Sequence, residues 1–135
     1  MVRMTTGIEG RSARRVVLTN MNRILAAIMR NLVGREADLV YAGDVALAEL
    51  PTVLPTLRPD VVVLSPPRSE RARAARDELR TVAFDLTVVE IRPRDDRAVI
   101  WRPGFGPEHI ALTSSGIVAA LRGVRAGRDL SGGAL

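Results

Sequence analysis

The chain contains no cysteine and no lysine, and its one histidine is His109. Without cysteine there is no disulfide, no thiolate metal ligand and no thiol nucleophile. Without lysine, every mechanism that needs a side-chain amine is excluded, and one histidine cannot make a histidine-rich metal site. We therefore expect no metal and no cofactor.

Aromatic residues are almost as scarce, although 47% of the residues are hydrophobic. The core must therefore be built from valine, leucine, isoleucine and alanine, which is typical of α/β packing. A chain of 135 residues is long enough for one domain with its own core and short for two. We expect a single domain over residues 14–126, with a flexible leader over 1–13 and a flexible tail over 127–135.

All twenty basic residues are arginines, which gives a net charge of +5 and a pI of about 11.3. This charge makes an acidic partner easier to attract. An arginine-only set also arises from coding bias in a GC-rich genome, so the pI by itself does not indicate nucleic-acid binding. No apolar run approaches the roughly 18 residues of a membrane span, and no apolar stretch follows the first basic residues. We expect a cytoplasmic protein.

The first half of the chain alternates between strand and helix patterns. "RVVLTN" (15–20) and "ADLVYAG" (37–43) are short aliphatic runs typical of strands. Between them, the spacing of apolar residues predicts a helix that Gly34 terminates and that buries one side, formed by Ile24, Leu25, Ile28, Leu32 and Val33. After the second run, Asp44 is placed to cap a short helix that prolines interrupt.

The second half begins with "PDVVVLS" (59–65), an uninterrupted aliphatic run typical of a strand buried on both faces of a parallel sheet. Ser69 is placed to cap the helix that follows. "FDLTVVEI" (84–91) and "RAVIWR" (97–102) are separated by too few residues for a parallel crossover, so they predict an antiparallel hairpin. "RPGFGPEH" (102–109) is interpreted as a turn-rich loop.

A last helix is expected from Ser114 or Ser115 to Arg125. The alternation of strands and helices predicts a three-layer α/β/α sandwich around a five-stranded, mostly parallel sheet. In such a sheet the functional edge lies at the carboxyl ends of the strands.

Three stretches occur in an order that carries a resemblance: "RVVLTNMNRILAAIMRNLV" (15–33), "YAGDVALAEL" (41–50) and "LRPDVVVLS" (57–65). Together they resemble the receiver domain of two-component response regulators, which has a flavodoxin-like fold. The resemblance covers Arg15 to Pro66, under half of the chain. It implies a pocket at the carboxyl ends of the strands.

The resemblance also implies which residues occupy that pocket. The acidic pair that holds magnesium in the family corresponds to Asn20 and Met21, and the phosphate-accepting aspartate corresponds to Ser65. Glu90 (or its neighbour Ile91) takes the place of the family's threonine or serine, and Arg102 that of its lysine. Since the first three positions hold no carboxylate, the resemblance implies a degenerate receiver that is not phosphorylated.

Several of these residues have more than one interpretation. Ser65 as a nucleophile would need a neighbouring base, so the end of a strand is the simpler interpretation. Asn20 and Asn22 either bind a ligand or cap a helix. The arginines between residues 68 and 80 are interpreted as a solvated helix face rather than as a phosphate-binding surface, with Arg73 and Asp77 at ion-pair spacing.

These observations favour a non-enzymatic, phosphorylation-independent regulatory module that binds another protein or itself, for example as a homodimer. We expect its interface at Trp101, on an edge strand, together with Ile100, Ile117 and Leu121. The alternative is a small-molecule sensor in which Asn20, Ser65 and Arg102 bind an anionic ligand. Nucleic-acid binding through the arginine-rich helix is a third, weaker hypothesis, and an enzyme is the weakest.

Overall fold

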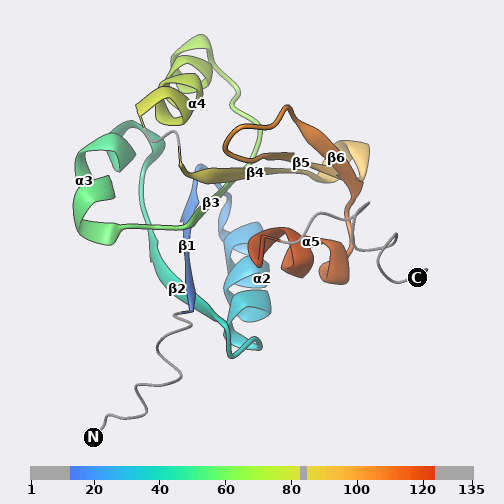
Figure 1. The fold of residues 1–135 in the computed structure, drawn as a ribbon. Coiled ribbons are helices and arrows are strands. Elements are labelled where there is room, and N and C mark those ends of the chain that lie inside the picture. The colour runs from blue at the N-terminus through green and yellow to red at the C-terminus, as the bar shows by residue number, and fades with distance from the viewer. Residues whose placement is uncertain (1–12, 83–84, 124–135) are drawn as a thin grey trace, which may run out of the picture.

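The computed structural model describes residues 13–82 and 85–123 (Figure 1). The expected leader and tail lie outside these ranges, apart from Ala13. The described elements are, in chain order, β1 (Arg14–Thr19), α2 (Arg23–Gly34), β2 (Leu39–Asp44), η1 (Leu47–Glu49), α3 (Leu50–Leu57), β3 (Val61–Leu64), α4 (Glu70–Val82), β4 (Thr87–Arg92), η2 (Pro93–Asp95), β5 (Arg97–Trp101), β6 (Glu108–Ala111) and α5 (Ser114–Leu121).

The strands form one mixed sheet in the order β2-β1-β3-β4-β5-β6. β1 to β4 are parallel, β5 is antiparallel to β4, and β6 is antiparallel to β5. The predicted α/β class and mostly parallel sheet are therefore confirmed. The predicted hairpin is also confirmed, with a one-turn helix at Pro93–Asp95 and Asp96 in the left-handed region at φ 56°.

The described sheet has six strands, so the prediction of five strands is wrong. The additional strand, β6, lies at the end of the segment that was interpreted as a loop. It escaped prediction because four residues with one charged and one histidine side chain lack the aliphatic run of a typical strand. Because β6 pairs with β5, β5 is not an edge strand. The prediction that Trp101 lies on an edge strand is therefore wrong.

Local side-chain contacts set the helix boundaries. Asn22 caps α2 by accepting a hydrogen bond from the Leu25 amide at 2.8 Å, and Ser69 accepts one from the Ala72 amide at 3.0 Å at the start of α4. The prediction that Asp44 caps a helix is wrong. Its carboxylate instead accepts hydrogen bonds from Arg30 (2.9 Å) and Tyr41 (3.1 Å).

The sheet has a hydrophobic cluster on each face. α3 and α4 lie on one side of the sheet, and α2 and α5 on the other (Figure 1). The cluster with α2 and α5 holds sixteen buried residues and the cluster with α3 and α4 holds eight. Burial of this aliphatic surface supplies the main stabilisation of the fold. None of the described helices has both the length and the apolar character to cross a membrane.

The face of α2 that is buried is only partly the predicted one. Leu32 and Val33 are buried as predicted, but Ile24 and Ile28 are 75% and 51% exposed, and Met29 is buried in the cluster instead. The helix is rotated so that the stripe one position further along the chain faces the sheet. Two isoleucines one helical turn apart therefore lie on the surface.

Three residues that were expected at an interface are buried inside the chain. Ile100, Ile117 and Leu121 are 1%, 6% and 0% exposed, and all three belong to the α2/α5 cluster. The side chain of Ile100 points toward this face because strand residues alternate, and α5 covers it there. α5 ends at Leu121 rather than at Arg125, which lies outside the described residues.

Candidate anion-binding site

The carboxyl ends of three parallel strands lie side by side at one edge of the sheet. Thr19 on β1 is in register with Leu64 on β3, and Leu64 with Glu90 on β4. Asn20 follows β1 in the left-handed region at φ 56°, which asparagine tolerates better than most residues. Its side-chain amide donates a hydrogen bond to the Ser65 carbonyl at 3.1 Å. The structure thus brings Asn20 and Ser65 together, as the resemblance implies.

Beside this contact is a pocket of about 920 Å³ at the carboxyl ends of β3 and β4. It is bounded by the start of α2, the segment from β3 into α4, and the β4–β5 turn; its lining residues are Asn22, Leu25, Ser65, Pro66, Pro67, Arg68, Arg73, Arg76, Glu90, Arg92, Pro93, Arg94 and Asp95. Five arginines and two acidic residues line it, so the pocket has an excess of three positive charges. We refer to it below as the arginine pocket.

Glu90 is the buried charge at the centre of the arginine pocket, with a side chain only 1% exposed. Its two carboxylate oxygens accept hydrogen bonds from Arg76 Nη1 at 2.9 Å and from Arg92 Nε at 2.7 Å. A carboxylate removed from water needs such partners, because an unpaired buried charge is very costly. Arg76 also pairs with Asp77 at 3.2 Å, so the charges of Arg76 and Arg92 are balanced, and the positive excess of the pocket comes from its other arginines.

The other three arginines of the pocket, Arg68, Arg73 and Arg94, are exposed. Across residues 13–82 and 85–123, none of them forms an ion pair with a carboxylate. A guanidinium group presents planar pairs of donors that match the oxygens of a carboxylate or phosphate. The arginine pocket can therefore bind an anion with donors from α4, from β4 and from the loops that follow β3 and β4.

Two predicted pocket residues lie elsewhere. Met21 is half-buried and packs against the α2/α5 cluster, on the opposite face of the sheet from Glu90. Arg102 follows β5, which runs antiparallel to β4, so it lies at the other edge of the sheet, where it pairs with Glu108. The predicted convergence of Arg102 with Asn20 and Ser65 is wrong, because a hairpin reverses the direction of its second strand.

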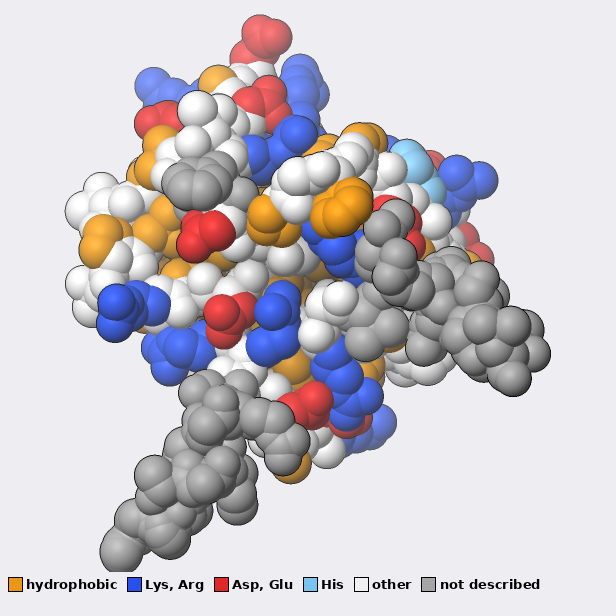
Figure 2. All heavy atoms as spheres, in the orientation of Figure 1, with side chains coloured by type: hydrophobic (Ala, Val, Ile, Leu, Met, Phe, Trp, Pro, Cys, Tyr) orange, Lys and Arg blue, Asp and Glu red, His pale blue; other side chains and the backbone are white. Residues whose placement is uncertain are grey.

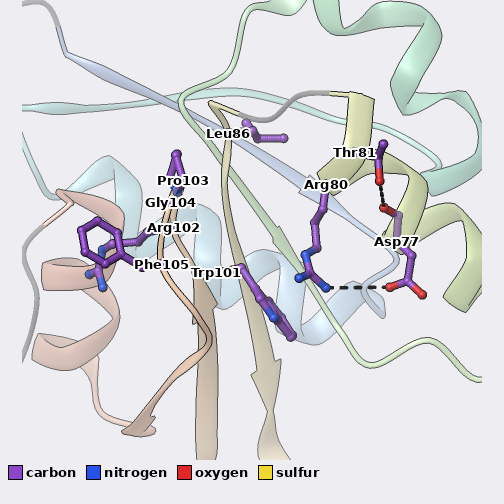
Figure 3. A pocket seen from close by; sticks show the side chains of 9 residues that line it. All are labelled: Asp77, Arg80, Thr81, Leu86, Trp101, Arg102, Pro103, Gly104 and Phe105. Carbon is purple, nitrogen blue, oxygen red and sulfur yellow. Dashed lines mark hydrogen bonds and ion pairs between the residues drawn. The ribbon is translucent and has the colours of Figure 1, made fainter.

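A second hollow, of about 470 Å³, lies at this other edge, between the second half of α4 and the end of β5 (Figure 3). Its wall includes Trp101 and Phe105, with Arg80 over the Trp101 ring at 4.8 Å from the ring centroid. Asp77 is 3.9 Å from Arg80 in the same wall. We refer to it below as the Trp101 hollow.

Sequence reasoning missed the arginines of the first pocket. It predicted an ion pair between Arg73 and Asp77, but Asp77 pairs with Arg76 at 3.2 Å and with Arg80. Arg76 follows Ala72 by one turn and precedes Leu79 by three residues, so it lies beside the apolar stripe of α4. A glutamate inside the aliphatic strand "TVVEI" needs a cation in three dimensions, and that was the signal that could have identified Arg76.

Within the described part of the chain, no three histidine, cysteine, aspartate or glutamate side chains lie close enough together to hold a metal ion. No protein-family model, curated protein or solved structure matches this chain. Function is therefore inferred from the chemistry of the pocket itself.

Proposed function

We propose that this chain is a receiver-like regulatory module that is not phosphorylated and that works by binding a small anion in the arginine pocket. The strand order 2-1-3-4-5 over the first five strands is that of flavodoxin-like folds, which supports this interpretation and the proposed three-layer arrangement. The reversed β5 and the additional β6 depart from that pattern.

The observation that carries the proposal is the charge of the pocket. The resemblance implies an acidic pocket that attracts a metal cation, whereas here Asn20 and Ser65 replace carboxylates and five arginines line the adjoining wall. The pocket has the opposite sign, so it attracts anions and repels magnesium. It lies where ligands bind in open α/β sheets, at the carboxyl ends of the strands.

The non-enzymatic part of the proposal follows from the state of the carboxylates. A serine nucleophile needs a base within hydrogen-bond reach. Both oxygens of Glu90 already accept hydrogen bonds from arginines, and in the part of the chain that the structure describes neither is bonded to the Ser65 hydroxyl. Binding, rather than covalent chemistry, is the better use of the site.

Two experiments test this function. In the first, the melting temperature is measured against phosphate, citrate and pyrophosphate at constant ionic strength, since a ligand that binds only the folded state raises it. We expect a saturable increase that Arg73→Gln weakens and Arg35→Gln does not. Arg35 is the matched control, because it is an exposed arginine beyond the far end of α2. An unmoved melting temperature with all three anions would contradict anion binding.

In the second, the protein is incubated with acetyl phosphate and magnesium, and its intact mass is measured. We expect no added phosphoryl group. A stable adduct that maps to Ser65 or its neighbours would show that the site is a phosphate acceptor and that the proposal is wrong.

Binding to another protein or to a second copy is the next candidate, favoured by the exposed pair Ile24 and Ile28 on α2. Exposed isoleucines one helical turn apart are typical of helix-mediated contacts. Sedimentation velocity over a range of concentrations tests self-association, with Ile28→Ser as the variant expected to weaken it. Nucleic-acid binding through the arginine-rich helix is not favoured, because Arg76 and Arg80 of α4 pair with acidic side chains. On the face seen in Figure 2, basic and acidic side chains are likewise interspersed.

A further inference from the structure

We propose that the arginine pocket takes a phosphate-bearing small molecule with at least two negative charges, and that Arg76 transmits its binding to Trp101 in the second hollow. This inference rests on the proposed function, since it names the ligand class of the same pocket and the residues through which ligand binding changes the surroundings of Trp101.

The ligand class follows from the balance of charge in the pocket. Its five arginines and two acidic residues leave an excess of three positive charges. A single carboxylate neutralises one of these, whereas a phosphate monoester carries about −1.5 to −2 at neutral pH and a diphosphate carries more. Arg68 lies in the loop before α4, Arg73 in the first half of α4 and Arg94 in the turn η2, and this spread suits several oxygens along a phosphate chain.

The apolar part of the lining limits the ligand further. Leu25, Pro66, Pro67 and Pro93 also line this pocket. A bare inorganic anion would leave this surface wet, whereas an organic phosphate ester would cover it. The volume of about 920 Å³ lies in the range of pockets that hold metabolite-sized molecules.

Arg76 lines the arginine pocket and also contacts Trp101, which lines the second hollow. Its Nη1 donates to Glu90 at 2.9 Å in the arginine pocket, and its guanidinium carbon lies 5.8 Å from the centroid of the Trp101 ring. Arg92, the other partner of Glu90, has no such contact with Trp101 among the described residues. A phosphate that accepts from Arg76 competes with Glu90 for the same donors.

A second contact extends this link along α4. Arg76 Nε donates to Asp77 at 3.2 Å, Asp77 is 3.9 Å from Arg80, and Arg80 lies over the Trp101 ring at 4.8 Å from its centroid. Figure 3 shows Arg80 between Asp77 and Trp101, with the Asp77 contact drawn as a dashed line. A shift of Arg76 toward a ligand therefore changes both cations that face the ring. Those contacts hold the ring by cation–π attraction, so the indole environment changes with it.

The first part of the test is the ligand class. Trp101 is the only tryptophan, so intrinsic fluorescence at constant ionic strength reports its surroundings without a label. Pyrophosphate is the probe, acetate is the monoanion, and isothermal titration calorimetry measures binding independently. We expect saturable pyrophosphate binding that is about tenfold or more tighter than that of acetate, as one further charge-assisted contact would give. Equal affinity for acetate and pyrophosphate would overturn the assigned ligand class.

The second part is the route through Arg76, and it compares two variants at the same carboxylate. Arg76→Met and Arg92→Gln each remove one partner of Glu90, and both are expected to weaken pyrophosphate binding about tenfold or more. At saturating pyrophosphate, Arg92→Gln should keep the Trp101 fluorescence change and Arg76→Met should lose it. Circular dichroism verifies folding; should Arg76→Met not fold, Asp77→Asn tests the same link, and it is expected to reduce the change without weakening binding.

The outcomes separate this inference from the proposed function. Calorimetric binding of pyrophosphate with no change in wild-type Trp101 fluorescence would overturn the route and leave the anion-binding function intact. Loss of the fluorescence change in Arg92→Gln but not in Arg76→Met would also overturn it. Tighter binding of a short single-stranded oligonucleotide than of pyrophosphate would replace the small molecule by nucleic acid. No binding of any anion would remove the proposed function as well.

Discussion

The two faces of the sheet differ in what they bury. The α2/α5 face buries a wholly apolar cluster that includes Met29, Ile100 and Leu121. The α3/α4 face has half as many buried aliphatic residues, and its strands also bury Thr19 and Glu90, with Trp101 half-buried beside them. Polar groups in a core reduce stability unless they are paired. The first face therefore contributes most of the apolar burial, and the second holds the buried polar groups.

This difference arises from the alternation of side chains along the strands. Thr19, Leu64 and Glu90 are partners in adjacent strands, so their side chains share the α3/α4 face at the carboxyl ends of the strands. Glu90 has two arginine partners, whereas the Thr19 hydroxyl is buried without a hydrogen-bond partner among the described residues. The face that buries these polar groups is the one whose Glu90 lines the arginine pocket.

The largest effects are expected when the same kind of cavity is made on each face of the sheet, which tests whether the two faces differ in function. Leu121→Ala and Leu79→Ala both remove a fully buried leucine, so each should lower the free energy of unfolding by about 2–5 kcal/mol in urea titrations. Only Leu79→Ala should also weaken anion binding, because Leu79 packs α4 against the sheet and α4 carries Arg73 and Arg76. Equal loss of anion affinity in both variants would show that the faces are not separate in function.

A smaller effect is expected at the buried carboxylate. Glu90→Gln leaves the Arg76 and Arg92 guanidinium groups without their acid, so the free energy of unfolding should fall by about 1–3 kcal/mol. The same change removes a negative charge from the arginine pocket, so pyrophosphate should bind about tenfold more tightly in calorimetry. Weaker binding in Glu90→Gln would mean that Glu90 itself contacts the ligand, contrary to the proposed site.

Thr19 should respond in the opposite direction. Thr19→Val replaces the unpaired hydroxyl by a methyl group of similar size, so the protein should become more stable by about 1 kcal/mol in urea titrations. Thr19 does not line the arginine pocket, and anion affinity should stay unchanged. A loss of stability would reveal that the hydroxyl makes a polar contact.

The smallest effect is expected at the ion pair between Arg122, just after α5, and Asp38, just before β2. The Arg122 guanidinium donates to Asp38 at 2.7 Å and holds the pKa of that carboxyl below its ordinary value of 3.8. The folded state therefore gains stability above this value and loses it as the pH falls through the lowered pKa. Asp38→Asn should lower the melting temperature slightly at pH 7, and the difference from wild type should vanish under strongly acidic conditions. A difference that grows on acidification would contradict the sign of the shift.

The sequence predicted the parts of this fold that depend on neighbouring residues. The β4–β5 hairpin followed from the short connection, and the start of α4 from Ser69. The approach of Asn20 to Ser65 followed from two strand ends and the resemblance. β6 was missed because four residues carry too little pattern to be recognised.

The arginine pocket was beyond prediction because its charge is a property of the folded chain. Arg73, Arg76, Arg92 and Arg94 come from a helix, a strand and a turn that are distant in the sequence. Periodicity alone placed the α4 arginines on a solvated helix face, whereas the side chain of Arg76 is only 16% exposed. Arg102 was assigned to the pocket by analogy, but strand direction places it at the other edge of the sheet.

The most direct test of the division between a structural face and a binding face is an NMR titration with pyrophosphate, following backbone amides and arginine Nε–H signals. We predict that saturable chemical-shift changes concentrate on pocket residues, namely Asn22, Ser65, Arg68, Arg73, Arg76 and Arg92. The chemical shifts of the α5 amides and of the exposed Arg35 should not change. Shifts spread evenly over the surface arginines, or centred on α2 and α5, would contradict it.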